Sequence, residues 1–158
     1  MEVQELIKDQ IQERVSQISY LQQEVESLQE KLKDSKNKTG IEKWLDYEFE
    51  SSSMTTPEFA TFAREYKKEL TKQLPDNCEI VAWSRGHFYI SCFIKNNTSG
   101  RFAYLSTSDV RHFPNEWYNN ILIRTAKHEK DYTGGSNDWS DWKNLKRNLE
   151  RLFKFADI

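Results

Sequence analysis

Residues 7–32 have the sequence IKDQIQERVSQISYLQQEVESLQEKL, and this stretch decides the architecture of the chain. Its large aliphatic residues recur at alternating steps of four and three, which places Ile11 at heptad position a and Ile7 at position d. A sustained repeat of about 3.5 residues is typical of a left-handed coiled coil, because a stripe of about 3.6 residues drifts around a helix. We therefore predict a coiled-coil helix with an aliphatic seam formed by Ile7, Ile11, Ile18, Leu21, Val25, Leu28 and Leu32.

The seam predicts self-association, because a single helix has nothing with which to cover it. β-Branched residues at position a and leucine at position d favour a parallel homodimer. Arg14 is the exception at d, and we expect its stem to pack while its guanidinium turns toward solvent. Two alternatives remain open: the helix can fold back on the rest of its own chain, or it can pair with a helix of a different partner.

Charge is distributed unevenly along the chain. The 158 residues carry 23 Lys and Arg against 25 Asp and Glu, a net charge of -2. Residues 1–50 hold 7 basic and 12 acidic side chains (net -5), residues 51–78 hold 4 of each, and residues 79–158 hold 12 and 9 (net +3). The two ends of the chain are thus electrostatically different.

Composition divides the chain in a similar way. Residues 1–40 contain a single aromatic residue, Tyr20, whereas 13% of the whole chain is aromatic. We predict a coiled-coil helix at 1–36, a linker with a short helix at 37–56, and a binding module at 57–158.

The overall charge and hydropathy exclude several protein classes. A net charge of -2 argues against a histone-like polycation. The chain has no run of about 18 apolar residues that could form a transmembrane helix. Its N-terminus is acidic and is not followed by the apolar segment of a signal peptide. We expect a cytoplasmic protein with no membrane partner.

Residues 57–158 show the pattern of an α+β fold. Helical spacing predicts helices over 57–74 and over about 138–155, and alternation predicts four strands, at 79–84, 87–95, 101–107 and 120–126. We expect Arg85-Gly86 to form a tight turn that sets Ser84 opposite His87. The predicted order, α-β-β-β-β-α, describes a small antiparallel β-meander flanked by helices.

Two further local signals concern helices. Apolar residues at helical spacing after Gly40 predict a short amphipathic helix. Thr55 and Thr56, followed by Pro57 and Glu58, predict a capped helix start.

The first candidate site is a glycine-containing basic loop that leads into the predicted last helix. Backbone N–H groups at paired glycines and at a helix N-terminus can bind an anion, and nearby cations strengthen this. The alternative is a surface loop whose glycines only make a turn. The candidate ligands for a phosphate or an acidic partner are Arg111, Arg124, Lys127, Lys130, Gly134, Gly135 and Ser136.

The second candidate site is a set of aromatic residues that core periodicity explains least well. Tryptophan and tyrosine are common anchors of protein interfaces, and aromatics interleaved with cations also bind nucleic acid. The alternative is that these residues belong to the core. The candidate anchors are Trp117, Tyr118, Tyr132 and Trp139.

Catalysis is poorly supported by the sequence. His87, His112 and His128 are scattered, and no pattern with metal-ligand spacing is present. Cys78 and Cys92 are predicted to lie on opposite faces of a hairpin and to remain thiols. We therefore expect a non-enzymatic protein without metal or cofactor.

Two resemblances complete the sequence argument. The order of elements resembles the outline of double-stranded-RNA-binding domains, although residues 137–141 are acidic where that family has a basic helix start. The composition, rich in Lys, Asn and aromatic residues, resembles small proteins of phages and mobile elements in low-GC bacteria, including anti-CRISPR inhibitors. This second resemblance implies an inhibitor of a host target such as a CRISPR nuclease.

Our leading hypothesis is therefore a coiled-coil homodimer that engages, and inhibits, a protein or nucleoprotein target. One alternative is an accessory factor of a phage or plasmid that binds DNA or RNA directly. Another is a structural assembly protein.

Overall fold

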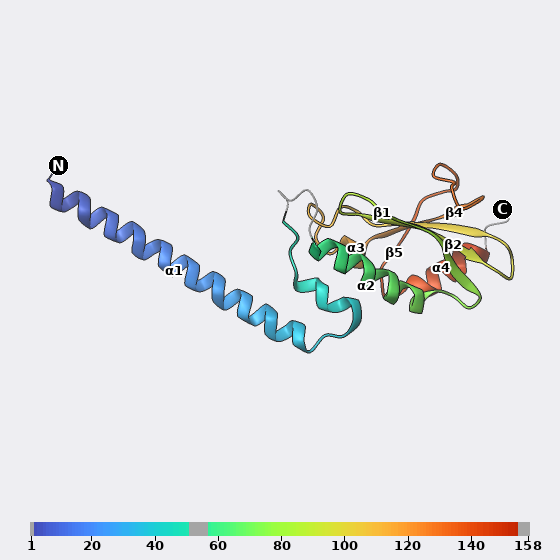
Figure 1. Ribbon diagram of the computed structural model, residues 1–158, viewed down its shortest axis with the longest axis horizontal. Helices are drawn as coiled ribbons and strands as arrows, with labels where there is room; N and C mark the ends of the chain where they lie inside the picture. The colour runs from blue at the N-terminus through green and yellow to red at the C-terminus, as the bar shows by residue number, and fades with distance from the viewer. Residues whose placement is uncertain (1, 51–56, 155–158) are drawn as a thin grey trace. The chain divides into compact units, whose positions relative to one another are not determined.

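A computed structural model of the chain describes residues 2–50 and 57–154 (Figure 1). The chain divides into two compact units, Met1–Asp46 and Tyr47–Ile158. The first unit holds the predicted N-terminal helix, and the second holds the mixed α and β elements. The prediction that residues 55 and 56 cap a helix lies outside the described residues.

The first unit consists of a long helix and a short one. Helix α1 spans Val3–Lys36, a length of 34 residues or about 50 Å, and none of its described residues is buried. Gly40, with a φ of 62°, turns the chain into η1, a 3₁₀ helix at Gly40–Asp46. An ion pair of 2.8 Å between Lys38 Nζ and Asp46 Oδ2 closes this turn. The helix predicted after Gly40 thus exists, but it is a 3₁₀ helix.

The second unit is built on one antiparallel sheet. Its five strands lie in sequence order, so each strand pairs with the next along the chain. This confirms an α+β fold with an antiparallel meander. The strands are β1 (Cys78–Arg85), β2 (Ile90–Asn96), β3 (Phe102–Ser106), β4 (Ile121–Ala126) and β5 (Asp138–Ser140).

Helices cover one face of the sheet. Helix α2 (Pro57–Gln73) begins at the proline that suits a first helical turn, and α4 (Leu145–Lys154) lies on the same face of the sheet (Figure 1). A short helix, α3 (Glu116–Asn119), precedes β4. The core between helices and sheet includes Phe62, Tyr66, Leu70, Ile90, Cys92, Ile94, Leu105, Ile121, Ile123, Leu145 and Leu149.

The β1–β2 hairpin differs from the prediction. Ser84 pairs with Ser91, not with His87, and the register shifts between Ile80 and Ala82. The turn is longer than two residues because Phe88 adopts a φ of 61° and is buried, with 1% of its surface exposed. Strict alternation cannot reveal a bulge, since the extra residue shifts the faces of one strand only.

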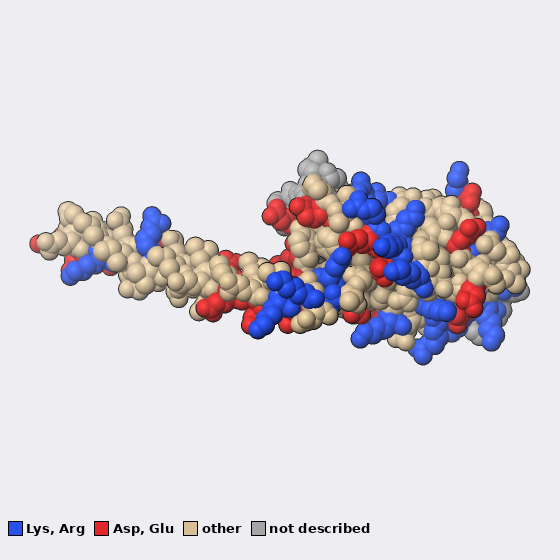
Figure 2. Space-filling model, turned by 60° about the horizontal axis from the view of Figure 1, so that its bottom comes forward, with Lys and Arg blue, Asp and Glu red and all other residues tan. Residues whose placement is uncertain are grey.

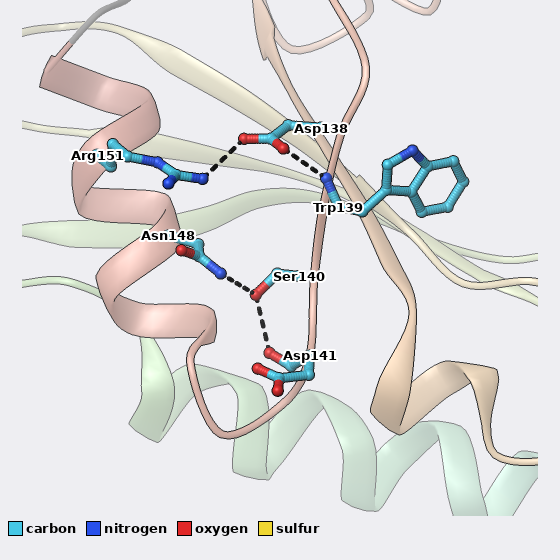
Figure 3. Close-up of polar contacts among 6 residues, drawn as sticks. All are labelled: Asp138, Trp139, Ser140, Asp141, Asn148 and Arg151. Atoms are coloured by element: carbon cyan, nitrogen blue, oxygen red, sulfur yellow. Dashed lines mark hydrogen bonds and ion pairs between the residues drawn. The ribbon is translucent and has the colours of Figure 1, made fainter.

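The C-terminal region also corrects the prediction. Residues Asp138–Ser140 form β5, and α4 begins only at Leu145. Ser140 is held by α4, since Asn148 Nδ2 donates to its Oγ at 2.8 Å (Figure 3). The sheet therefore has a fifth strand where a helix start was expected. Within the described residues, no helix combines the length and the apolar character needed to cross a bilayer.

Candidate binding surfaces

The seam of α1 is exposed along its whole length. The seven aliphatic residues of the predicted seam are between 49% and 62% exposed. At the one position of the seam that is not aliphatic, the guanidinium Nη1 of Arg14 donates to Gln17 Oε1 at 3.2 Å along the helix surface. A row of half-exposed aliphatic residues costs free energy in water, and a partner that covers it would gain that free energy.

The loop at residues 127–137, which is part of the predicted phosphate site, folds around the carboxylate of Asp131. The backbone N–H groups of Lys127 and Gly134 each donate to an oxygen of Asp131 at 2.8 Å, and the N–H of Thr133 donates at 3.3 Å. These hydrogen bonds, first that of Lys127, lower the pKa of the Asp131 carboxyl. A side chain of the protein itself thus occupies the N–H groups that we expected to bind a phosphate.

The two glycines serve this loop. A Cβ on Gly134 would collide with the Asp131 carboxylate, and a Cβ on Gly135 would collide with the carbonyl oxygen of Thr125. Gly135 also has a φ of +76°, which favours glycine. Ser136 is exposed and precedes β5, so it does not cap a helix. These contacts favour the alternative that the glycines make a turn.

An acidic residue also closes the turn that precedes α4. The backbone N–H of Asn144 donates to Asp141 Oδ1 at 2.9 Å, and Asn144 Nδ2 donates to Asp141 Oδ2 at 3.1 Å. A carboxylate at this position complements the helix dipole. The loop N–H groups that favoured an anion in the sequence are therefore bonded within the chain, and the expected helix start after the glycines is the strand β5.

Two of the predicted phosphate ligands are committed to other partners. Arg111 makes a paired contact with Asp109, at 3.1 Å from Nε and 2.8 Å from Nη2, and its Cζ lies 4.1 Å from the centre of the Phe88 ring. Burial alone would raise the pKa of the Asp109 carboxyl, but the hydrogen bonds and charge of Arg111 outweigh it and lower that pKa. Arg111 therefore stabilises the turn before β2 and does not join the loop.

Arg124 is held on the sheet. Its Cζ lies 4.4 Å from the centre of the Tyr104 ring, and its Nη2 donates to the carbonyl oxygen of Asp131 at 3.2 Å. Its Nε is buried without a hydrogen-bond partner in the described part of the chain. Of the predicted cations, Lys127 and Lys130 are the two that lie exposed.

The predicted aromatic anchors separate into two pairs. Trp117 and Tyr118 are 2% and 7% exposed, and the Trp117 ring packs edge-on against Phe62 with centroids 5.0 Å apart. The prediction that these two form an exposed patch is wrong, because α3 turns them into the core. Tyr132 and Trp139 are 56% and 50% exposed.

The exposed pair lies on the sheet face that α2 and α4 leave uncovered, which we call the open face. Trp139 pairs with Leu122, and its indole points away from α4 (Figure 3). The Tyr132 ring stacks edge-on against Phe93 and Tyr104, with centroid separations of 5.1 and 5.9 Å. The open face thus combines aromatic rings with the guanidinium of Arg124.

A second charged surface, absent from the predicted sites, lies on α4 and the turn before it. Three of its exposed cations, Arg147, Arg151 and Lys154, lie at spacings of four and three residues on the side of α4 away from its buried residues, and Lys146 lies at the edge of that side. The helical period of the cations was present in the sequence and would have identified this surface. We call it the basic helix face: Lys143, Lys146, Arg147, Arg151 and Lys154.

The groups that could carry metal or thiol chemistry are the His, Cys, Asp and Glu side chains of the described residues. The described residues contain no group of three or more His, Cys, Asp or Glu side chains that could hold a metal ion. Cys78 and Cys92 are free thiols. Burial raises the pKa of the Cys92 thiol to about 12, so it is not a thiolate nucleophile near neutral pH.

Comparison of the chain with protein-family models, curated proteins and solved structures yields no match. The function must therefore be argued from the surfaces themselves.

Proposed function

We propose that this chain is a non-enzymatic binding protein that dimerises through α1 and engages a partner protein or nucleoprotein through the open face of its second unit. The observation that carries the proposal is the exposure of seven aliphatic residues at coiled-coil spacing along α1. The compositional resemblance to phage and mobile-element proteins suggests the specific form of this function, which is inhibition of a host nucleic-acid enzyme such as a CRISPR nuclease.

A second copy of α1 is the occupant that fits the seam best. The seam repeats with the coiled-coil period, so an identical helix can pack each side chain into a gap of its partner along about four heptads. The first unit is acidic, but most of its e and g positions are neutral: Gln10, Gln17, Gln22 and Gln29 are among them. Pairing of two copies therefore meets little charge repulsion beside the seam.

The open face supplies the recognition surface in this proposal. Tyr132 and Trp139 are each at least half exposed, and residues of these types dominate the binding energy of protein interfaces. A dimer presents two such faces, which raises the apparent affinity for a target that both can reach.

Paired substitutions in the full-length chain test the dimer. Ile18→Glu with Leu21→Glu places carboxylates in the seam, whereas Ser16→Glu with Gln23→Glu adds the same charge on the outer side of α1. We expect light scattering to give a monomer mass for the seam variant and a dimer mass for both the outer variant and the wild type. Equal masses for the two variants would contradict dimerisation through the seam.

A second pair of variants tests the open face. Trp139→Ala removes a ring on the open face, and Phe113→Ala removes a comparably exposed ring, at 51%, elsewhere in the second unit. In affinity capture from the native host, we expect one protein to be retained by the wild type and by Phe113→Ala and to be lost with Trp139→Ala. Equal retention by both variants would place the recognition surface elsewhere.

A further inference from the structure

The positive charge of the second unit is concentrated in one segment. Residues 143–154 contain five basic side chains and one acidic one, Glu150, for a net charge of +4. Residues 79–158 as a whole have a net charge of +3, so the part of this range outside residues 143–154 has a net charge of -1. The basic helix face is thus the source of the positive character of the C-terminal half.

Most cations of the basic helix face make no side-chain hydrogen bond or ion pair within the described part of the chain. Within the described part of the chain, Lys143, Lys146 and Arg147 have no hydrogen bond or ion pair through their side chains, whereas Arg151 contacts Asp138 at 3.1 Å and is still 54% exposed. This contrasts with Arg111 and Arg124, whose guanidinium groups are bound within the fold.

Helix α2 adds cations on the same side of the sheet. Arg64, Lys67, Lys68 and Lys72 are exposed, although Lys72 pairs with Glu69 at 3.2 Å. Figure 2 shows blue Lys and Arg side chains gathered over the helical side of the second unit, with fewer red acidic groups among them. The field of such a surface attracts polyanions.

The composition of this surface favours nucleic acid over a protein partner. None of the large exposed hydrophobic residues among those described belongs to α2 or α4. Protein interfaces are depleted in lysine at their centres and depend on aromatic and apolar anchors, which this face lacks. Single-stranded nucleic acid also needs rings on which its bases can stack, so a duplex is the better match.

We propose that the basic helix face binds the phosphate backbone of duplex nucleic acid without reading its sequence. This inference goes beyond the proposed open-face function and does not depend on dimerisation. Together the two surfaces suit a nucleoprotein target, with protein contacts on the open face and phosphate contacts on α4.

Fluorescence anisotropy with a labelled DNA duplex of about 20 base pairs tests this on the full-length protein. The key variant is Lys146→Gln with Arg147→Gln, and the matched control is Lys127→Gln with Lys130→Gln, which removes the same charge from the exposed loop. Each phosphate contact contributes about 0.9 to the slope of log Kd against log salt concentration. We expect the α4 variant to lower this slope by about 2 and to weaken binding about 50-fold near 0.1 M salt.

The loop control should leave both the slope and the affinity within about threefold of the wild type. An equal effect of both variants would show that only net charge matters and would overturn the assignment to α4. Absence of wild-type binding to the duplex at low salt would also overturn it. Binding of a poly-glutamate probe in place of the duplex would point to an acidic protein partner and would contradict the proposal.

Discussion

Replacing Arg14 by leucine should tighten the proposed dimer, because Arg14 is the only seam position that is not aliphatic. The leucines at the other d positions, Leu21 and Leu28, are 56% and 62% exposed, so pairing can remove about half of a leucine from water. Full burial of a leucine gains about 1.5–3 kcal/mol, which gives about 1 kcal/mol per substituted chain and about 2 kcal/mol per dimer.

This gain corresponds to a Kd lower by about 10- to 30-fold, at 1.4 kcal/mol per tenfold change; the lower end allows for the aliphatic stem of arginine, which already covers part of the seam. Sedimentation equilibrium over a dilution series measures it. Lys33→Leu is the matched control, since it exchanges a cation for leucine on the outer side of α1. Weaker association of Arg14→Leu, or equal tightening by the control, would refute a role for position 14 in the seam.

Three further predictions concern the second unit. Trp117→Ala should lower the free energy of unfolding by about 3–5 kcal/mol in urea titrations, and Trp139→Ala by at most about half as much, because the former ring is buried and the latter half exposed; equal losses would contradict this assignment. The fold lowers the pKa of Asp131 below its ordinary value of 3.8, so its stabilisation is present above that pH and is lost as the pH falls through the folded pKa. Acid unfolding of Asp131→Asn should therefore depend less on pH than that of the wild type, and identical acid profiles would count against this role. A thiol reagent near neutral pH should modify Cys78 in the native protein but reach Cys92 only after unfolding, because Cys92 is 1% exposed; native labelling of both thiols at one rate would contradict the burial.

The elements that sequence reasoning located well are those with long periodic signals. The repeat in residues 7–32 lies within α1, and the apolar face from Phe59 to Leu70 belongs to α2, whose C-terminus at Gln73 precedes Pro75. Each of these signals extends over several helical turns, so that a single irregular residue, such as Arg14, does not obscure it.

Short and locally irregular features escaped prediction. β5 is three residues long, and its residues fall at the start of the helix that spacing predicts over about 138–155. Its strand character comes from pairing with β4, a contact that no local pattern records. The bulge near Val81 and the left-handed Phe88 similarly depend on how the hairpin closes on the core.

The candidate site was harder to predict because residue type does not report burial. Trp117 and Trp139 are the same residue type in opposite environments. Helix α3 turns Trp117 into the core, whereas the alternation of side chains along β5 places Trp139 on the open face. The cations of β4 and of α4 also look alike in sequence, yet Arg124 is bound to Tyr104 and Asp131, while the side chains of Lys146 and Arg147 bind no group in the described part of the chain. Only the fold shows which charges have internal partners.

The solution mass of the full-length wild-type protein tests the central claim most directly. One chain has a mass of 18.9 kDa, so the seam predicts twice that value, about 37.8 kDa, by light scattering at concentrations above the dimer Kd. A mass of 18.9 kDa at every accessible concentration would show that α1 does not pair with a second copy and would contradict the account.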